Sequence, residues 1–202
     1  ATRSIIYDST GGEMALLFAD EDRQEVPLSA VPKLLQTSVI TVEDADFYRH
    51  KGVSLRSIAR ALSSDVSAGG VAQGGSTITQ QLIKNSVTGS QQTAERKVRE
   101  ALLALQLEKQ MTKKQILERY LNTLYLGHGA YGVEAASETY FNKSVGQLDW
   151  PEAALLTSLI RNPTGYDPIN FPKRSKERRE VVVSRLLSEK VIDAATAKRI
   201  RE

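Results

Sequence analysis

The chain is organised around one stretch, Glu43-Asp44-Ala45-Asp46-Phe47-Tyr48-Arg49-His50-Lys51-Gly52, which combines three carboxylates with two aromatic rings, a histidine and a closing glycine. Before it, apolar residues recur at helical spacing and predict a helix with one buried face: Val31, Leu34, Leu35, Val39 and Val42. Ser29 is a candidate N-cap for this helix. The C-terminal end of a helix disfavours carboxylates. The acidic cluster is therefore either a solvent-facing helix end or part of a site.

Composition limits the classes of protein that fit. The chain has 202 residues, of which 41% are hydrophobic and 25% charged, enough for one ordinary domain or two small lobes. No cysteine is present, which excludes disulfides and thiolate metal sites. A net charge of +3 is too small to indicate nucleic-acid binding, so no nucleic acid is expected as a partner. No apolar run could span a bilayer and no signal peptide is visible.

Basic residues gather in one late segment, at Lys173, Arg174, Lys176, Arg178, Arg179 and Arg185. Such a cluster suits anionic lipid heads, although a solvated helix face explains it more simply. The basic cluster therefore fits either a surface that binds anionic lipid or an ordinary solvent-exposed helix face.

The remaining patterns predict a mainly helical fold with one hairpin. Residues 4–18 place one apolar run on each side of a turn with two glycines and are expected to form the hairpin. Helix start signals occur at Ser54, Ser76-Thr77, Thr93, Thr112, Tyr131, Asp149, Ser175 and Asp193. Residues 68–75 are glycine-rich and are expected to form a mobile loop. The helix after Thr93 is apolar along two stripes, one with Leu103 and the other with Val98, Leu102 and Leu105, so both stripes are expected to be buried.

The residue types restrict the chemistry. His50 and His128 are the only histidines and lack metal-site spacing, and neither a Gly-x-Ser-x-Gly elbow nor a P-loop occurs. Carboxylates with cationic support remain, namely Glu43 and Glu100 with Lys84 and Arg96. A glutamate can take a proton from a sugar hydroxyl, and cations can neutralise a departing phosphate. Arg96 and Glu100, four residues apart, also fit a plain helical ion pair.

The chain resembles the peptidoglycan glycosyltransferase domain, glycosyltransferase family 51, of class A penicillin-binding proteins and their monofunctional relatives. Five segments carry the resemblance, in order. They are Glu43-Asp44-x-x-Phe47-x-x-His50-x-Gly52, Gly74-Gly75-Ser76-Thr77-Ile78-Thr79-Gln80-Gln81-Leu82-x-Lys84-Asn85, Arg96-Lys97-x-x-Glu100, Tyr120-Leu121-Asn122-x-x-Tyr125-x-Gly127 with Tyr131-Gly132, and Ala153-Ala154-Leu155-Leu156 through Arg161-x-Pro163 to Tyr166-x-Pro168. Together they span most of residues 31–168.

The resemblance implies a single domain over residues 1–202, with a lysozyme-like head lobe and a smaller, membrane-associated jaw lobe near residues 52–73. It also implies polymerisation of lipid II into β-1,4-linked glycan with inversion and release of undecaprenyl pyrophosphate. The implied partners are lipid II, the growing lipid-linked glycan and the outer face of the bacterial cytoplasmic membrane. A member of this family is also a target of moenomycin.

The resemblance assigns roles to individual residues. Glu43 matches the general base that takes the proton from the acceptor's GlcNAc 4-hydroxyl, and Glu100 a second carboxylate that acts on the pyrophosphate directly or through Mg or Mn. No organic cofactor is implied. The positions that match donor-phosphate cations are Lys84 and Arg96. The positions that match the polar cleft wall or shape the first motif are Ser76, Thr77, Gln81, Asn85, Asp44, Phe47 and His50.

The family's transmembrane anchor is not seen, and neither Ser-x-x-Lys nor Lys-Thr-Gly of a transpeptidase occurs. We therefore expect this stretch to be the transferase domain of a bifunctional protein, although a monofunctional enzyme trimmed of its anchor would look similar. Two other functions are kept open. A lytic enzyme on the same scaffold would use Glu43 as a general acid on existing glycan. A non-enzymatic module would bind anionic lipid through its basic faces, and its binding would weaken with salt.

Overall fold

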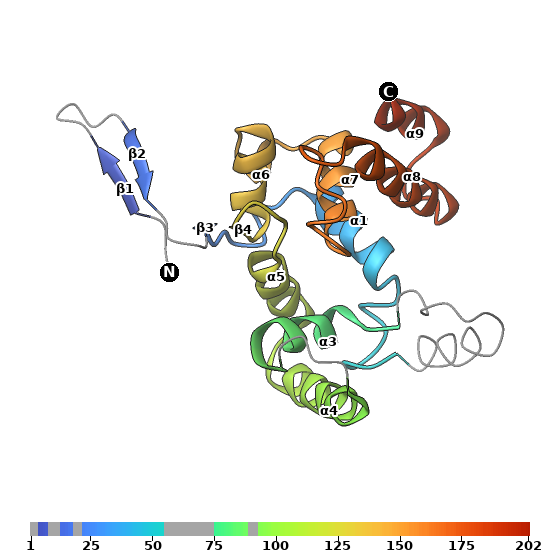
Figure 1. Cartoon of the computed structure of the whole chain (residues 1–202). Coiled ribbons are helices and arrows are strands. Elements are labelled where there is room, and N and C mark those ends of the chain that lie inside the picture. Colours follow the sequence, from blue (N-terminus) through green and yellow to red (C-terminus); the bar gives the residue numbers. More distant parts are fainter. Residues whose placement is uncertain (1–3, 8–12, 18–21, 55–74, 89–92) are drawn as a thin grey trace.

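The computed structural model describes residues 4–7, 13–17, 22–54, 75–88 and 93–202, and this part of the chain is mainly helical (Figure 1). β1 (Ser4–Tyr7) pairs antiparallel with β2 (Glu13–Leu17), and β3 (Asp22–Arg23) pairs parallel with β4 (Ala130–Tyr131). Several expectations lie outside these residues: the hairpin turn, the helix after Ser54, nearly all of the jaw lobe, and the loop of residues 68–74.

The described helical segments run along the chain as α1 (Lys33–Glu43), α3 (Ile78–Ile83), the π-helical η1 (Lys84–Thr88), α4 (Ala94–Gln110), α5 (Lys113–Thr123), α6 (Val133–Phe141), the 3-10 helix η2 (Val145–Gln147), α7 (Trp150–Leu159), α8 (Pro172–Ser188) and α9 (Ala194–Arg201).

Local capping sets most of the helix starts. Capping boxes begin α3 at Thr77, α5 at Thr112 and α7 at Asp149. In each, the side chain of the N-cap residue accepts from the backbone N–H at N3, and the N3 side chain accepts from the backbone N–H of the N-cap. Thr93 and Asp193 cap α4 and α9 through single hydrogen bonds. These start signals are confirmed, because they depend only on residues close in sequence.

Three starts differ from the prediction. Ser29 does not cap α1; the N-cap is Pro32, which makes no side-chain hydrogen bond. The helix predicted from Ser175 already begins at Pro172, since proline is preorganised for a first helical turn. The helix predicted from Tyr131 begins at Val133, because residues 130–131 form β4 instead.

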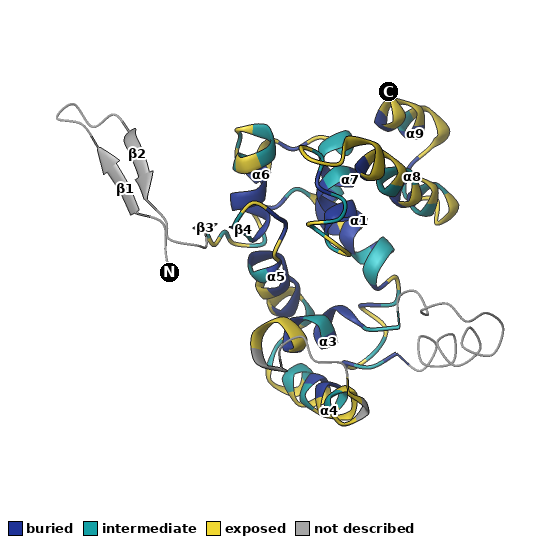
Figure 2. Cartoon of the chain, viewed as in Figure 1, coloured by how far each residue is buried: buried dark blue, intermediate teal, exposed yellow. Residues whose placement is uncertain are grey.

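Two groups of buried apolar side chains hold the helices together (Figure 2). The larger group joins α1, α3, α5, α6 and α7, and includes Leu35, Phe47, Ile78, Tyr120, Leu121 and Leu156. The smaller group joins α7 to α8 and α9, and includes Ala154, Val182, Val183, Leu186 and Ile200. Helix α7 contributes to both, so it links the C-terminal helices to the helix that ends at Glu43.

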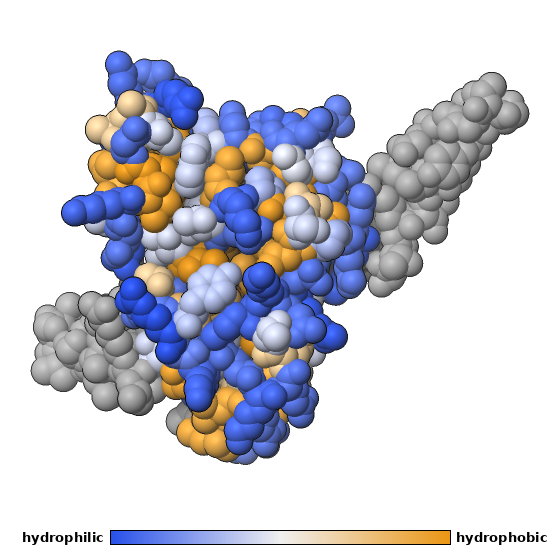
Figure 3. Space-filling view, turned by 180° about the vertical axis from the view of Figure 1, so that it is seen from behind, coloured by the Kyte–Doolittle hydropathy of each residue, from blue (hydrophilic) through white to orange (hydrophobic). Residues whose placement is uncertain are grey.

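The prediction that both apolar stripes of α4 are buried is wrong. Val98, Leu102 and Leu105 are 61%, 57% and 41% exposed, whereas Ala104 and Glu100 are fully buried. Among the described elements, the helix packs against α3 and η1, and Figure 3 shows apolar surface at the end of the molecule formed by α4. Among the described residues, no helix combines the length and apolar character needed to cross a membrane.

Gly52 closes the decapeptide in a conformation that a side chain would disturb. Its φ is +90°, and a Cβ there would lie 2.7 Å from the carbonyl oxygen of Ala104. We predict that Gly52→Ala lowers the free energy of unfolding by about 1–3 kcal/mol, as expected for strain of this kind. Urea unfolding would measure the change. Gly146→Ala is the control, since its Cβ would meet only the Ala30 oxygen at 3.4 Å; equal costs at both sites would contradict the argument.

Candidate active site

The carboxylate of Asp44 joins the end of α1 to the start of α3. Asp44 is the C-cap of α1 and is only 6% exposed. Its Oδ2 accepts from the backbone N–H of Ile78 at 3.0 Å and lies 2.8 Å from His50 Nε2. Thr77 Oγ1 donates to the carbonyl of Gly52 at 2.6 Å, at the other end of the decapeptide. Asp44 itself is thus the anion bound at the N-terminus of α3.

His50 is held from both sides of its ring. The ammonium of Lys113, which has only donors, lies 3.5 Å from Nδ1. The other ring nitrogen, Nε2, lies against the carboxylate of Asp44. Lys113 also sits 4.4 Å above the centre of the Phe47 ring and donates to Glu108 at 2.7 Å. The rings of the first motif are thus fixed by a lysine some sixty residues away, which the sequence patterns did not single out.

Glu43, the last residue of α1, is positioned by a short chain of side chains. Gln81 Nε2 on α3 donates to Glu43 Oε2 at 3.0 Å, and Tyr120 on α5 donates its O–H to Gln81 Oε1 at 2.7 Å. Burial, then the charges of Glu43 and Asp44, raise the pKa of Tyr120 well above its usual value, so the phenol stays protonated. The phenol thereby turns the amide of Gln81 so that its N–H faces Glu43.

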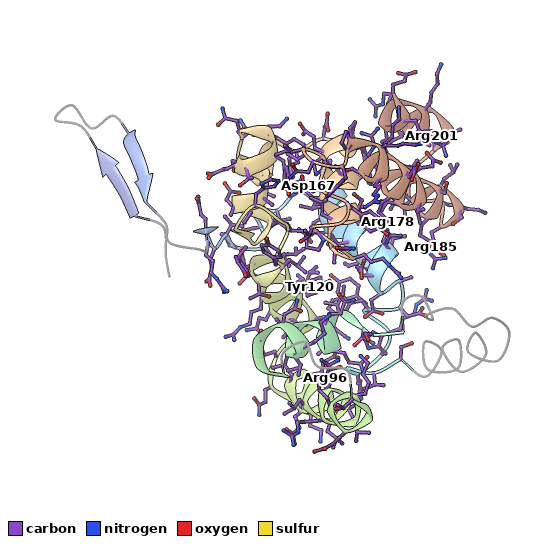
Figure 4. The ribbon with its side chains drawn as sticks, in the orientation of Figure 1. Arg96, Tyr120, Asp167, Arg178, Arg185 and Arg201 are labelled. Atoms are coloured by element: carbon purple, nitrogen blue, oxygen red, sulfur yellow. The ribbon has the colours of Figure 1, made fainter. Side chains whose placement is uncertain are left out.

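The electrostatic setting of Glu43 makes its carboxylate a stronger base than that of an ordinary glutamate, because its pKa is raised. Burial raises the pKa of Glu43, while the hydrogen bond from Gln81 and the charges of Arg178 and Arg161 lower it part of the way back. Arg178 lies on α8, which packs beside α1 (Figure 4), and its Nε is buried without a hydrogen-bond partner among the described residues. Arg161 follows α7 and is exposed. General-base catalysis is more efficient when the pKa of the carboxyl group is raised toward the working pH.

The second candidate carboxylate, Glu100, is fully buried and faces two cations. Its Oε1 lies 3.1 Å from Arg96 Nε and its Oε2 3.0 Å from Lys97 Nζ. Lys97 also donates to Ser76 Oγ at 2.8 Å, at the segment that leads into α3. The plain helical pair expected from the spacing is therefore part of a larger ionic group that reaches the polar segment before α3.

A pocket of about 540 Å³ opens beside Gln81. Lys84 and Asn85, both exposed on η1, line it together with Arg161. Gln81 also donates to Glu43, so this side chain links the pocket to the candidate base, and the charge of Arg161 acts on Glu43 as well. The site can therefore offer a proton acceptor next to positive charge that suits a phosphate.

The structure brings most of the candidate residues together but does not expose all of them. Asp44, Phe47 and Thr77 are buried, while His50 keeps 8% of its side chain exposed. Ser76 and Gln81 remain partly exposed. Sequence patterns missed the roles of Arg178, Lys113 and Lys97, although Arg178 stands in the basic late segment and Lys97 in the motif Arg96-Lys97-x-x-Glu100.

The chain matches the family model described as Transglycosylase over residues 11–187. It is 42% identical to penicillin-binding protein 1F of Bacillus subtilis strain 168 over 194 residues, and 42% identical to penicillin-binding protein 1A of Aquifex aeolicus strain VF5 over 186 residues. These alignments cover 96% and 92% of this chain but 27% and 26% of the relatives, so the chain spans roughly a quarter of their length.

A solved structure shares the fold. Penicillin-binding protein 1A from Haemophilus influenzae aligns with a TM-score of 0.57 and 25% sequence identity, over 100% of this chain and 20% of that chain. The mainly helical architecture of the described residues is therefore that of a known structure.

The hydrogen bond from Gln81 predicts a measurable effect on Glu43. Gln81→Met removes a donor that favours the ionised carboxylate, so the pKa of Glu43 should rise further. A carbon NMR titration of protein with labelled glutamate carboxyls would report the change. Gln147→Met, at an exposed position on η2, serves as the control. An unchanged pKa of Glu43 in the Gln81 variant would show that this hydrogen bond does not tune the carboxyl.

Proposed function

The chain belongs to the transglycosylase family, and we propose that it polymerises lipid II into peptidoglycan glycan strands. The observation that carries the proposal is the Glu43 carboxyl, whose pKa is raised by burial and which is bonded to Gln81 beside a pocket lined by cations. An acceptor hydroxyl and a donor phosphate both find suitable partners in this arrangement.

In the proposed reaction, the Glu43 carboxylate takes the proton from the 4-hydroxyl of the acceptor's GlcNAc. The hydroxyl oxygen then bonds to the anomeric carbon of the donor's terminal muramyl sugar, on the face opposite the leaving group. The bond from that carbon to the phosphate oxygen breaks with its electron pair, and undecaprenyl pyrophosphate leaves. Attack from the opposite face inverts the anomeric configuration and gives the β-1,4 linkage.

Cations near Gln81 would offset the charge that develops on the leaving pyrophosphate. Lys84 and Arg161 line the same pocket and are exposed. A preorganised cation in a partly enclosed site stabilises developing negative charge without having to reorganise. Glu100 is fully buried, and each of its carboxylate oxygens is paired with a cationic side chain. We therefore assign it the task of holding Arg96 and Lys97, and through Lys97 the hydroxyl of Ser76.

The residues around Glu100 do not fit a divalent cation. Each of its two carboxylate oxygens faces a cationic side chain. The part of the chain that the structure describes also contains no group of three acidic or histidine side chains able to hold a metal. Magnesium and manganese prefer several oxygen ligands, so no step of the proposed reaction is routed through a metal.

The expected partners follow from the same proposal. Lipid II and the lipid-linked glycan are anchored in a membrane, so the site would work at the outer face of the bacterial cytoplasmic membrane. The exposed apolar side of α4, with Val98, Leu102 and Leu105, suits contact with that surface. The relatives are about three and a half times as long as this chain, which is consistent with a transpeptidase domain fused to the transferase in the full-length protein.

We predict that Glu43→Gln abolishes glycan polymerisation from labelled lipid II while the chain stays folded. The amide cannot accept the hydroxyl proton, and loss of a general base costs at least about 100-fold in rate. Electrophoresis of the products would measure polymer, with circular dichroism to check the fold. Glu177→Gln, which removes an exposed carboxylate from α8, is the matched control and should keep its activity.

The products also separate the rival functions, in this chain and in the full-length protein. Shortened glycan would identify a lytic enzyme in which Glu43 is an acid. Equal polymer yield from Glu43→Gln and the unaltered protein would remove Glu43 from the role of base. Lipid binding without any turnover would favour a non-enzymatic module.

A further inference from the structure

The side-chain amide of Gln81 has a separate partner for each of its hydrogen-bonding groups. Its Nε2 donates to Glu43 Oε2 at 3.0 Å and to the carbonyl oxygen of Ser76 at 3.4 Å, while its Oε1 accepts from the Tyr120 hydroxyl at 2.7 Å. A reversed amide would point its oxygen at a carboxylate and a carbonyl, which are both acceptors. Of the two orientations, the observed one therefore satisfies all three neighbours.

Tyr120 fixes this orientation from inside the core. Its side chain is fully buried on α5, which packs against α3 (Figure 4). Within the described part of the chain, Gln81 Oε1 is the one acceptor that the phenol hydroxyl reaches. A buried hydroxyl that loses its acceptor is costly, so Tyr120 opposes reversal of the amide whether Glu43 is ionised or protonated.

The two oxygens of the Glu43 carboxylate have different surroundings. Oε2 is bound by Gln81, whereas no hydrogen bond or ion pair from the described residues reaches Oε1. Part of the Glu43 side chain is exposed. Because a general base must come within hydrogen-bond reach of the proton that it takes, Oε1 is the oxygen that the protein leaves for a substrate hydroxyl.

We propose that Tyr120 is a positioning residue of the transfer reaction, which fixes the Gln81 amide as a donor to Glu43 Oε2 and so holds Glu43 ionised with Oε1 left for the acceptor hydroxyl. This inference rests on the proposed function, because it takes Glu43 as the base. The donor is in place before the substrate arrives, so the charged carboxylate does not have to wait for the amide to turn. Tyr120 keeps its own proton throughout.

The first test measures the pKa of Glu43 and needs no turnover. In Tyr120→Phe, Gln81 Oε1 loses its donor, so the amide can turn and accept a hydrogen bond from protonated Glu43. We therefore expect a higher pKa of Glu43 than in the unaltered chain, in a carbon NMR titration whose Glu43 signal is assigned by its absence from Glu43→Gln. An unchanged pKa would overturn the proposal.

Two further variants separate positioning from a general effect of losing a phenol. Tyr140→Phe removes a hydroxyl that donates to the Leu126 carbonyl at 2.8 Å, and should leave the pKa of Glu43 unchanged. In a chain that already carries Gln81→Met, Tyr120→Phe should have no further effect on this pKa, because residues that act as a unit are not additive. An equal shift with and without Gln81 would show that Tyr120 does not act through the amide.

The second test is the pH dependence of kcat/KM for polymerisation of lipid II. Below the apparent pKa of the base, we expect Tyr120→Phe to lower kcat/KM about three- to tenfold, as for the loss of one hydrogen bond, and to have little effect at higher pH, where Glu43 is ionised in both proteins. A loss by the same factor at every pH would indicate a merely structural role and overturn the proposal. The expected NMR shifts in a chain that makes no polymer would instead contradict the proposed function and leave the control of Glu43 by Tyr120 standing.

Discussion

The whole site depends on one carboxylate placed between two helix ends. Asp44 follows α1, where the helix carbonyls disfavour negative charge, but its Oδ2 accepts the Ile78 N–H at the start of α3, where the helix field favours it. The unfavourable interaction of the Asp44 charge with the end of α1 is therefore offset by its favourable interaction with the start of α3. Because this bond fixes α3 against the end of α1, it also sets the distance between Gln81 and Glu43, on which the behaviour of the candidate base depends.

The pKa of Glu43, at the end of α1, is set by its surroundings. Removal from water raises its pKa, and the single amide of Gln81 together with the arginines of the α7–α8 region restores only part of the stability of the charged form. The C-terminal helices thus contribute to the site through charge as well as through packing. Tyr120 belongs to the same arrangement, since its fully buried phenol turns the amide that faces Glu43.

Much of the helical fold could be predicted from the sequence, because start signals such as Thr112 with Gln115 act over three residues. The acidic cluster was likewise found at the end of its helix.

Periodicity alone identifies an apolar face without revealing whether anything covers it, which is why the exposure of Leu102 was missed. Lys113 and Arg178 reach the site through contacts between distant segments. The resemblance marked residues as functional, yet only packing separates exposed Lys84 from buried Thr77.

The pH dependence of kcat/KM for polymerisation by the unaltered protein tests the central claim most directly. A general base works only when ionised, and burial raises the pKa of Glu43. We therefore predict that kcat/KM falls as the pH drops through an apparent pKa above the ordinary value of a glutamate. A rate that falls instead as the pH rises through that pKa would identify a protonated Glu43 as the active form, and would contradict its assignment as the base.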